Sequence, residues 1–374
     1  MRTRKDDHVT STRYALLLLL VLGASARPAP LSTSRAADPK AFLDSLDALR
    51  REANIPGLSV AVVRDRQVVL ADGLGYADLE RHEPATAETP YDIASVSKPI
   101  SAVVALKLAE AGTLDLDRPL AEYSPWKQFC REFSAQPSLF ARDLQCDPAT
   151  HSLRHLLTHT AAGRPGARFS YNPILYSWAS RPMMAVTGTA FSSLVDRYVF
   201  APAKMTRSAR KHRDLPLPET LARALAPPHR VDGSGAIVRA PDLEPQGDGA
   251  AGGVVSTAAD LARFDIALDD GTLITPASLR EMVTPARSSD GAALPYGLGW
   301  YVQEYGGQTL VWHSGWWEEA YSALYLKVPR KALTLILLAN SEGLWWSNPL
   351  DRAEVQRSPF ARAFLRAWLG VEVP

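Results

Sequence analysis

The sequence has little of several features that mark whole classes of protein. Its 374 residues contain only two cysteines, and 41 Lys and Arg nearly balance 40 Asp and Glu, so the formal net charge is +1. This balance provides no overall field to attract nucleic acid or an anionic membrane, and neither partner is expected. No internal repeat is present, and no segment after the N-terminus approaches transmembrane length. With 46% hydrophobic residues, the composition is that of a globular protein.

The N-terminus has the pattern of a secretory signal peptide over residues 1–26. Basic residues precede a short apolar run at 15–22, and Ala24-Ser25-Ala26 supplies the small residues that a signal peptidase requires. An uncleaved N-terminal anchor is the alternative, and it is the one membrane contact that the sequence allows. Both interpretations predict an exported protein, periplasmic or extracellular. A linker rich in Pro, Ser and Ala follows at 27–40, and a folded domain is expected over 41–374.

The distribution of patterns predicts an α+β fold. A hairpin is expected from two strands at 57–63 and 67–70, and a helix at 96–110. Residues 113–227 mix short helical patterns with Pro-rich connections, and an amphipathic helix is expected at 360–369. Strand-like segments return late in the chain at 298–303, 308–312, 321–328 and 332–339. We therefore expect an antiparallel sheet built from both chain ends, flanked by helices, with an inserted region that is mostly helical.

Two local features carry structural expectations of their own. Cys130 and Cys146 lie in one polar and aromatic stretch, so a disulfide closing that loop is predicted for an exported chain, with two free thiols as the alternative. The basic run from Arg207 to Arg213 is interpreted as a solvated loop.

The strongest chemical motif is Ser95-Val96-Ser97-Lys98. A serine hydroxyl needs a base within hydrogen-bond reach, and a residue three positions later on a helix lies on the same face. Burial among polar groups lowers the pKa of a lysine enough to make it a base. On its own the motif is common, because many solvated helix starts contain a serine and a lysine.

Further segments give that motif a context. They are Leu153-Arg154-His155-Leu156-Leu157-Thr158-His159-Thr160, Phe169-Ser170-Tyr171, the glycine-containing run 251–260, Tyr296-Gly297-Leu298-Gly299-Trp300 and His313-Ser314-Gly315. With them the chain resembles the penicillin-recognising serine hydrolases, in the class C β-lactamase-like branch that includes D-peptidases and esterases. The resemblance extends from about residue 43 to residue 340.

The resemblance implies a role for each matching residue. Ser95 would be the acylated nucleophile, Lys98 its partner and Tyr171 a second general base, whose anion the positive charge of Lys98 would favour. The backbone N–H groups of Ser95 and Trp316 would form the oxyanion hole. The implied chemistry requires no cofactor and no metal.

The strand motif and its neighbours are expected to bind substrate. His313, Ser314 and Gly315 stand where the family usually has Lys-Thr-Gly or His-x-Gly, and Trp317 follows closely. Because an unperturbed histidine is mostly neutral at pH 7, His313 would hold a substrate carboxylate less firmly than lysine does. Together with Trp316 and Trp317, it favours esters or hydrophobic acyl groups over β-lactams.

One departure from the family pattern affects recognition of the acyl group. The family motif Tyr-x-Asn here becomes Tyr171-Asn172-Pro173, so a proline replaces the amide that normally contacts the substrate. Asn172 is the candidate substitute. The expected substrate is a small ester, D-peptide or lactam.

The same sequence disfavours two other kinds of hydrolase. His151, His155 and His159 recur every four residues and would share a helix face, but the glutamate that zinc hydrolases place after such a histidine is replaced by Leu156. No Gly-x-Ser-x-Gly elbow of an α/β-hydrolase occurs. Two alternatives stay open, a class C-like β-lactamase and a non-catalytic scaffold that binds a cell-wall fragment or a partner.

Overall fold

The computed structural model describes residues 38–141, 144–147 and 150–370, so the predicted signal peptide and most of the linker lie outside the described residues. The described residues all belong to one compact unit, Ala36–Pro374. Its first helix, α1 (Pro39–Glu52), begins two residues before the predicted start of the folded domain, because the Asp38 carboxylate accepts the backbone N–H groups of Lys40 and Ala41 at 3.0 and 3.3 Å.

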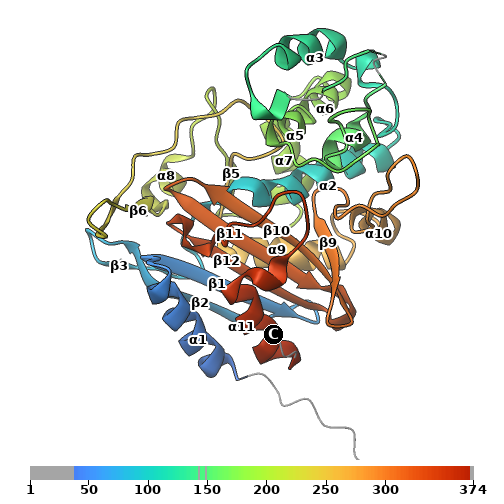
Figure 1. Ribbon diagram of the computed structural model, residues 1–374. Helices are drawn as coiled ribbons and strands as arrows, with labels where there is room; N and C mark the ends of the chain where they lie inside the picture. Colours follow the sequence, from blue (N-terminus) through green and yellow to red (C-terminus); the bar gives the residue numbers. More distant parts are fainter. Residues whose placement is uncertain (1–37, 142–143, 148–149, 371–374) are drawn as a thin grey trace, which may run out of the picture. The chain divides into compact units, whose positions relative to one another are not determined.

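The core of the fold is a seven-stranded antiparallel sheet in the order β3-β2-β1-β12-β11-β10-β9 (Figure 1). Its strands are β1 (Gly57–Arg64), β2 (Gln67–Asp78), β3 (Glu83–Pro84), β9 (Tyr301–Tyr305), β10 (Gln308–Trp317), β11 (Tyr321–Val328) and β12 (Leu333–Ala339). The first and last strands pair directly, with Leu58 opposite Ala339 and Arg64 opposite Leu333. The predicted sheet built from both chain ends is therefore confirmed.

Helices cover both faces of the sheet. On one face, α1 packs beside α11 (Pro359–Leu369), where Phe42 lies 6.2 Å from Phe364 and 5.9 Å from Trp368 between ring centroids (Figure 1). The other face is covered by α2 (Ser97–Glu110) and α9 (Ala258–Asp269). Most of α2 is buried because it lies between the sheet and the helical region.

Helices outweigh strands among the regular elements between α2 and α9, although loops make up most of this region, which contains the predicted helical region 113–227. It contains α3 (Trp126–Ser134), α4 (Leu153–Leu157), α5 (Pro173–Ser177), α6 (Ser180–Thr187), α7 (Phe191–Val195), a π-helical turn Asp196–Phe200 and α8 (Glu219–Ala224). Figure 1 shows α3 to α7 gathered at one end of the sheet. Short strands accompany them, namely β4 (Tyr91–Asp92), β5 (Ala209–Arg210), β6 (His229–Val231), β7 (Ile237–Arg239) and β8 (Val254–Ser256), and α10 (Pro276–Met282) follows α9.

A disulfide closes the loop between Cys130 and Cys146, whose Cα atoms are 5.6 Å apart. Nearby, Trp178 packs against Trp126 and Phe133 at 5.6 and 5.3 Å between ring centroids. This aromatic contact and the disulfide attach α3 to the rest of the helical region. In the described part of the chain, every helix is too short or too polar to cross a bilayer.

Candidate active site

Ser95 lies in a tight turn at the start of α2. The 3-10 turn η1 (Ala94–Val96) leads directly into the helix, so the half-buried Ser95 precedes its first residue. Ala94 has a positive φ of 47°, a conformation that costs an L-residue roughly 1–2 kcal/mol. The turn is held by Asp92, whose Oδ1 accepts the Ala94 N–H at 2.9 Å. The surrounding structure thus fixes a strained backbone immediately before the candidate nucleophile.

The three side chains that the motifs single out meet at one atom. Lys98 Nζ lies 2.7 Å from Ser95 Oγ, because one helical turn separates the two residues. The hydroxyl of Tyr171, which precedes α5, lies 3.1 Å from the same oxygen. Lys98 Nζ also lies 5.1 Å from the centre of the Tyr171 ring. The fold therefore brings a hydroxyl, an amine and a phenol within proton-transfer distance.

Burial decides which of these groups is charged. The Lys98 side chain is fully buried, and its second partner is the neutral carbonyl oxygen of Ala251 at 3.2 Å. Burial lowers the pKa of Lys98 well below its ordinary value, which favours the free amine. Burial also raises the pKa of Tyr171, against a smaller opposite effect of its hydrogen bond to Ser95. These directions contradict the expected Tyr171 anion, because they favour a protonated phenol and leave the neutral amine as the candidate base.

Gly315 brings the strand motif against the nucleophile turn. A Cβ at this position would collide with the carbonyl oxygen of Ile93 and lie 3.2 Å from the Ala94 Cβ. Only glycine allows β10 to pass so close to η1. The contact places the chain segments that carry the backbone N–H groups of Ser95 and Trp316 side by side, as an oxyanion hole requires.

His313 does not present a free ring nitrogen to a ligand. Its Nδ1 lies 2.7 Å from the carbonyl oxygen of Ser314, so Nδ1 donates, and Nε2 accepts the Tyr296 hydroxyl at 2.8 Å. Burial is the main cause that lowers the pKa of His313 well below its ordinary value, and Lys98 adds to it. The ring is neutral, as the sequence suggested, but direct substrate binding by His313 is not supported. Ser314 is also buried.

Asn172 and Pro173 form the start of α5 and not a substrate contact. Asn172 Oδ1 accepts the Leu175 N–H at 3.0 Å, and its Nδ2 donates to the carbonyl oxygen of Phe140 at 2.7 Å. Pro173 occupies the first helical position, where a missing N–H costs little. The proposed substitution of the family amide by Asn172 is therefore wrong, because its amide is buried and occupied.

The two tryptophans after the glycine differ in their contacts. Trp317 donates its indole N–H to Asp92 Oδ1 at 2.9 Å, so it supports the nucleophile turn. Trp316 remains 38% exposed and stacks on Trp345 at 5.4 Å between ring centroids. Its indole N–H donates to Glu342 at 3.0 Å, on the 3-10 turn Glu342–Leu344. An apolar aromatic surface thus lies next to the residues of the candidate oxyanion hole.

Sequence reasoning missed the support behind Lys98. Arg210 belongs to the basic run that was expected to be solvated, but its side chain is only 1% exposed. Its guanidinium donates to the carbonyl oxygens of Gly249 and Gly252 at 2.8 and 2.9 Å, on either side of Ala251. The glycines between 247 and 253 were the available sequence signal, since such a run brings backbone close to other groups.

The three regularly spaced histidines do not share a helix face. The helix α4 covers only Leu153–Leu157, so His151 precedes it, and His159 follows it with a positive φ of 55°. His151 Nε2 donates to the carbonyl oxygen of Ala161 at 2.9 Å. Within residues 38–141, 144–147 and 150–370, no group of three His, Cys, Asp or Glu side chains is arranged to hold a metal ion.

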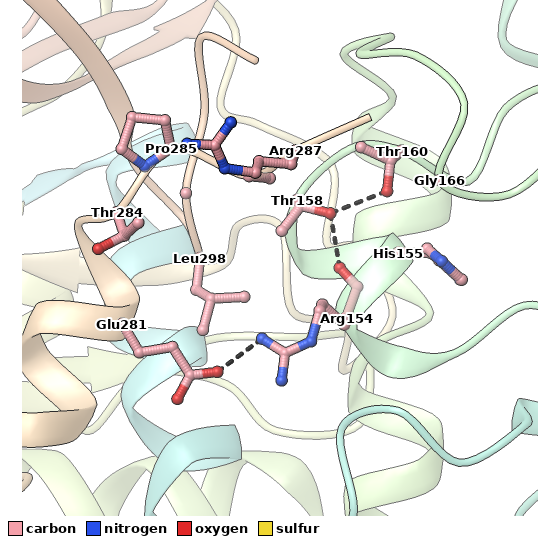
Figure 2. A pocket seen from close by; sticks show the side chains of 12 residues that line it. Arg154, His155, Thr158, Thr160, Gly166, Glu281, Thr284, Pro285, Arg287 and Leu298 are labelled. Atoms are coloured by element: carbon pink, nitrogen blue, oxygen red, sulfur yellow. Dashed lines mark hydrogen bonds and ion pairs between the residues drawn. The ribbon is translucent and has the colours of Figure 1, made fainter. Parts of the chain in front are cut away.

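A separate pocket of about 280 Å³ opens between α4 and residues 281–298 (Figure 2). Arg154 in its wall is paired with Glu281 and Asp117, each at 2.6 Å. Figure 2 shows Thr158 bonded to Thr160 in the same wall, at 2.9 Å. Neither Ser95 nor Lys98 lines this pocket, so it is distinct from the candidate active site.

Comparison with known proteins shows the family to which the chain belongs. A family model described as Beta-lactamase matches residues 42–357. The serine beta-lactamase-like protein LACTB, mitochondrial, of Mus musculus is 43% identical over 100 residues, which cover 27% of this chain and 18% of the mouse protein. The chain thus spans less than a fifth of the length of that relative.

Two solved structures show the same fold. The octameric penicillin-binding protein homologue from Pyrococcus abyssi aligns with a TM-score of 0.72 and 23% identity, over 89% of this chain and 78% of that chain. The D-amino acid amidase from Ochrobactrum anthropi SV3 aligns with a TM-score of 0.64 and 21% identity, over 80% of this chain and 91% of that chain. Because the family model covers most of the sequence, the chain belongs to the Beta-lactamase family of serine hydrolases.

Proposed function

We propose that the chain is an exported serine hydrolase that cleaves esters or D-amino acid amides and D-peptides through an acyl-enzyme on Ser95. The observation that carries the proposal is the buried Lys98 amine 2.7 Å from Ser95 Oγ, with the Tyr171 hydroxyl 3.1 Å from the same oxygen. A buried amine of lowered pKa is able to take the serine proton near neutral pH.

Acylation follows from this arrangement. Lys98 Nζ takes the Ser95 proton while Oγ forms a bond to the substrate carbonyl carbon, and the carbonyl oxygen becomes negative in the site of the two backbone N–H groups. The bond from the carbonyl carbon to the leaving alcohol or amine then breaks. The leaving group takes a proton from the Tyr171 hydroxyl, and the Lys98 ammonium returns the proton it took from Ser95 to the resulting phenolate. A water molecule completes the cycle by the reverse steps and releases the acid.

The surroundings of Ser95 support neutral and apolar substrates. His313 is neutral and both ring nitrogens are bonded within the protein, so it supplies no positive charge for a carboxylate. The exposed face of Trp316 suits an apolar acyl or leaving group. Both features favour aryl or alkyl esters over β-lactams, which carry a carboxylate.

A substrate panel tests this preference. We expect kcat/KM for a short-chain p-nitrophenyl ester to exceed that for a chromogenic cephalosporin, with D-phenylalanine amide as the third arm. The D-amide arm is included because the similar solved amidase acts on D-amino acid substrates according to its name. Ser95→Ala should abolish every activity. A cephalosporin that is hydrolysed faster than the ester would overturn the preference in favour of a class C-like β-lactamase.

A covalent probe separates catalysis from a pure binding role. A fluorophosphonate should add to Ser95 in the wild type and not in Ser95→Ala, with the adduct located by mass spectrometry. A wild type that stays unlabelled and inactive on the panel would favour the non-catalytic scaffold.

Export is part of the proposal and is supported by the signal-peptide pattern and by the Cys130–Cys146 disulfide, which suits an oxidising compartment. The intact mass of protein recovered from the periplasm or medium should correspond to a chain that starts at Arg27. Recovery of the protein only from the cytoplasm would overturn this part.

A further inference from the structure

Lys98 depends on a short glycine-containing segment for its second hydrogen-bond partner. The carbonyl oxygen of Ala251 lies 3.2 Å from Lys98 Nζ. Its neighbours Gly252 and Gly253 have no side chains to hold the segment, and Gly253 adopts a φ of +82°. Such a backbone keeps one conformation only where other groups fix it.

Arg210 supplies that fixation. Its guanidinium donates to the carbonyl oxygens of Gly249 and Gly252, at 2.8 and 2.9 Å, and its Nε lies 3.2 Å from Asp248 Oδ1. The planar guanidinium of Arg210 therefore bonds to the segment on both sides of Ala251. A lysine at this position would have a single nitrogen and could not make the three contacts together.

Lys211, the next residue, reaches the other half of the site. Its Nζ lies 3.3 Å from Oδ2 of the buried Asp92. The opposite carboxylate oxygen, Oδ1, accepts the Ala94 N–H and the Trp317 indole N–H, each at 2.9 Å. Asp92 is thus held from one side while it fixes the strained residue immediately before Ser95.

A three-stranded sheet makes the two contacts part of one unit. Strand β8 pairs with both β4 and β5, with Val255 opposite Asp92 and Val254 opposite Arg210. The Lys211 N–H also donates to the carbonyl oxygen of Gly253 at 2.8 Å. The segments that carry Asp92, Arg210 and Ala251 are therefore joined by backbone hydrogen bonds.

We propose that Arg210 and Lys211 are positioning residues for the acylation site, Arg210 for Lys98 through the segment 249–252 and Lys211 for Ser95 through Asp92. The inference depends on the proposed hydrolase function, because it assigns these residues to that reaction. Arg210 is bonded to the segment 248–252 and Lys211 to Asp92, so each residue affects Ser95 and Lys98 indirectly.

The two residues should affect different kinetic properties. In Arg210→Lys the segment loosens and water reaches Lys98, so the pKa of the amine rises and the ascending limb of the pH profile of kcat/KM moves to higher pH. In Lys211→Met the nucleophile turn loses its support, so kcat falls by about 100-fold while KM and the ascending limb stay unchanged. Asp92→Asn keeps the acceptor for Ala94 but not the charge, and should resemble Lys211→Met.

The experiment measures ester hydrolysis and the rate of fluorophosphonate labelling of Ser95 from pH 5 to 10, with thermal melting of every variant. Arg213→Lys is the matched control, since Arg213 is an exposed arginine of the same run, and should behave as the wild type. An Arg210→Lys variant that folds and retains the wild-type pH profile overturns the role of Arg210. If that variant unfolds, Arg210→Gln is measured in its place by the same criterion.

Lys211 is judged separately. A wild-type kcat in both Lys211→Met and Asp92→Asn overturns its role, and an equal loss in Arg213→Lys would show that the changes are general effects of the basic run. A wild type that neither hydrolyses the ester nor labels would overturn the proposed function itself, and this inference with it.

Discussion

Lys98 carries the clearest prediction for activity. The active form of a general base is the unprotonated one, so kcat/KM should rise with pH through the lowered pKa of Lys98 and be level above it. Lys98→Met should lose about 10³-fold in kcat/KM, because no base remains for the Ser95 proton. Pre-steady-state acylation rates between pH 5 and 10 provide the measurement. An ascending limb that persists in Lys98→Met would assign the base to another group.

The lowered pKa of Lys98 should also make the stability of the protein depend on pH. This pKa is lower in the folded state than the ordinary 10.5, so between these two values the unfolded chain binds more protons and stability rises with pH. Below the folded-state pKa, Lys98 is protonated in both states, and the cost of burying its charge lowers the stability in full. The stability of Lys98→Met relative to the wild type should therefore be most favourable at low pH and decline as pH approaches 10.5.

Urea unfolding at several pH values measures this difference. Lys331→Met is the control, because Lys331 is exposed and its replacement removes a lysine without changing the buried site. A difference for Lys98→Met that stays constant with pH would mean that the folded protein holds this lysine charged.

The motifs predicted which side chains would meet but not their protonation. Spacing along α2 was enough to bring Lys98 to Ser95, and the resemblance supplied Tyr171 from far along the chain. The Tyr171 anion was wrong because a motif does not report how deeply its residues are buried. Asn172 was wrong for a similar reason, since its amide nitrogen is occupied by the carbonyl oxygen of Phe140, a contact that one-dimensional spacing cannot reveal.

Strand β10 owes its position to one glycine. Gly315→Ala would place a methyl group against the carbonyl oxygen of Ile93 and within 3.2 Å of the Ala94 Cβ, so either β10 or η1 must move. We expect kcat to fall by about 100-fold, because movement of either element separates the two N–H groups of the candidate oxyanion hole. Steady-state kinetics with the p-nitrophenyl ester measures the loss.

Gly233→Ala is the matched control for that substitution, since an added Cβ there meets open space and should leave kcat unchanged. Equal activity in Gly315→Ala and Gly233→Ala would contradict the role of Gly315 in positioning β10. A variant that binds the fluorophosphonate at the wild-type rate but turns over slowly would place the defect after acylation and contradict the expected mechanism.

The bounds of an element were predicted well where local sequence patterns decide them. They were predicted poorly where contacts with residues distant in the sequence decide them. Strand β11 matches its predicted range, because turn residues bound it on both sides. Strand β9 begins at Tyr301 and not at Leu298, since Gly299 turns with a φ of +82° and packs against the carbonyl oxygen of Lys98. The basic run was expected in solvent, and Arg210 is buried because the carbonyl groups of a distant segment surround it.

At the scale of the whole molecule, a charge cluster away from Ser95 connects two strands of the sheet to the helix α9. Lys327 of β11 is bonded to Asp265 and lies 3.0 Å from Asp269, both on α9. Tyr325 and Thr334 also donate to Asp265, at 2.7 and 3.1 Å, so β11, β12 and α9 share one carboxylate. Lys327 and Asp265 are buried, whereas Asp269 is exposed, so removing Lys327 leaves the buried charge of Asp265 without compensation.

Lys327→Met should therefore lower the free energy of unfolding by about 3–5 kcal/mol at pH 7, measured by urea denaturation. Partial burial already raises the pKa of Asp269, and loss of the ammonium raises it further, so the folded variant gains a proton before the unfolded chain does. The deficit of Lys327→Met in unfolding free energy, relative to the wild type, should shrink as pH falls towards 4.

Adding Asp265→Asn removes one of the two unpaired charges, so the double variant should be more stable than the sum of the single effects predicts. Because the cluster does not contact Ser95, the folded fraction of each variant should keep the wild-type pH profile of kcat/KM, and a shifted profile would show that the sheet transmits this charge to the site.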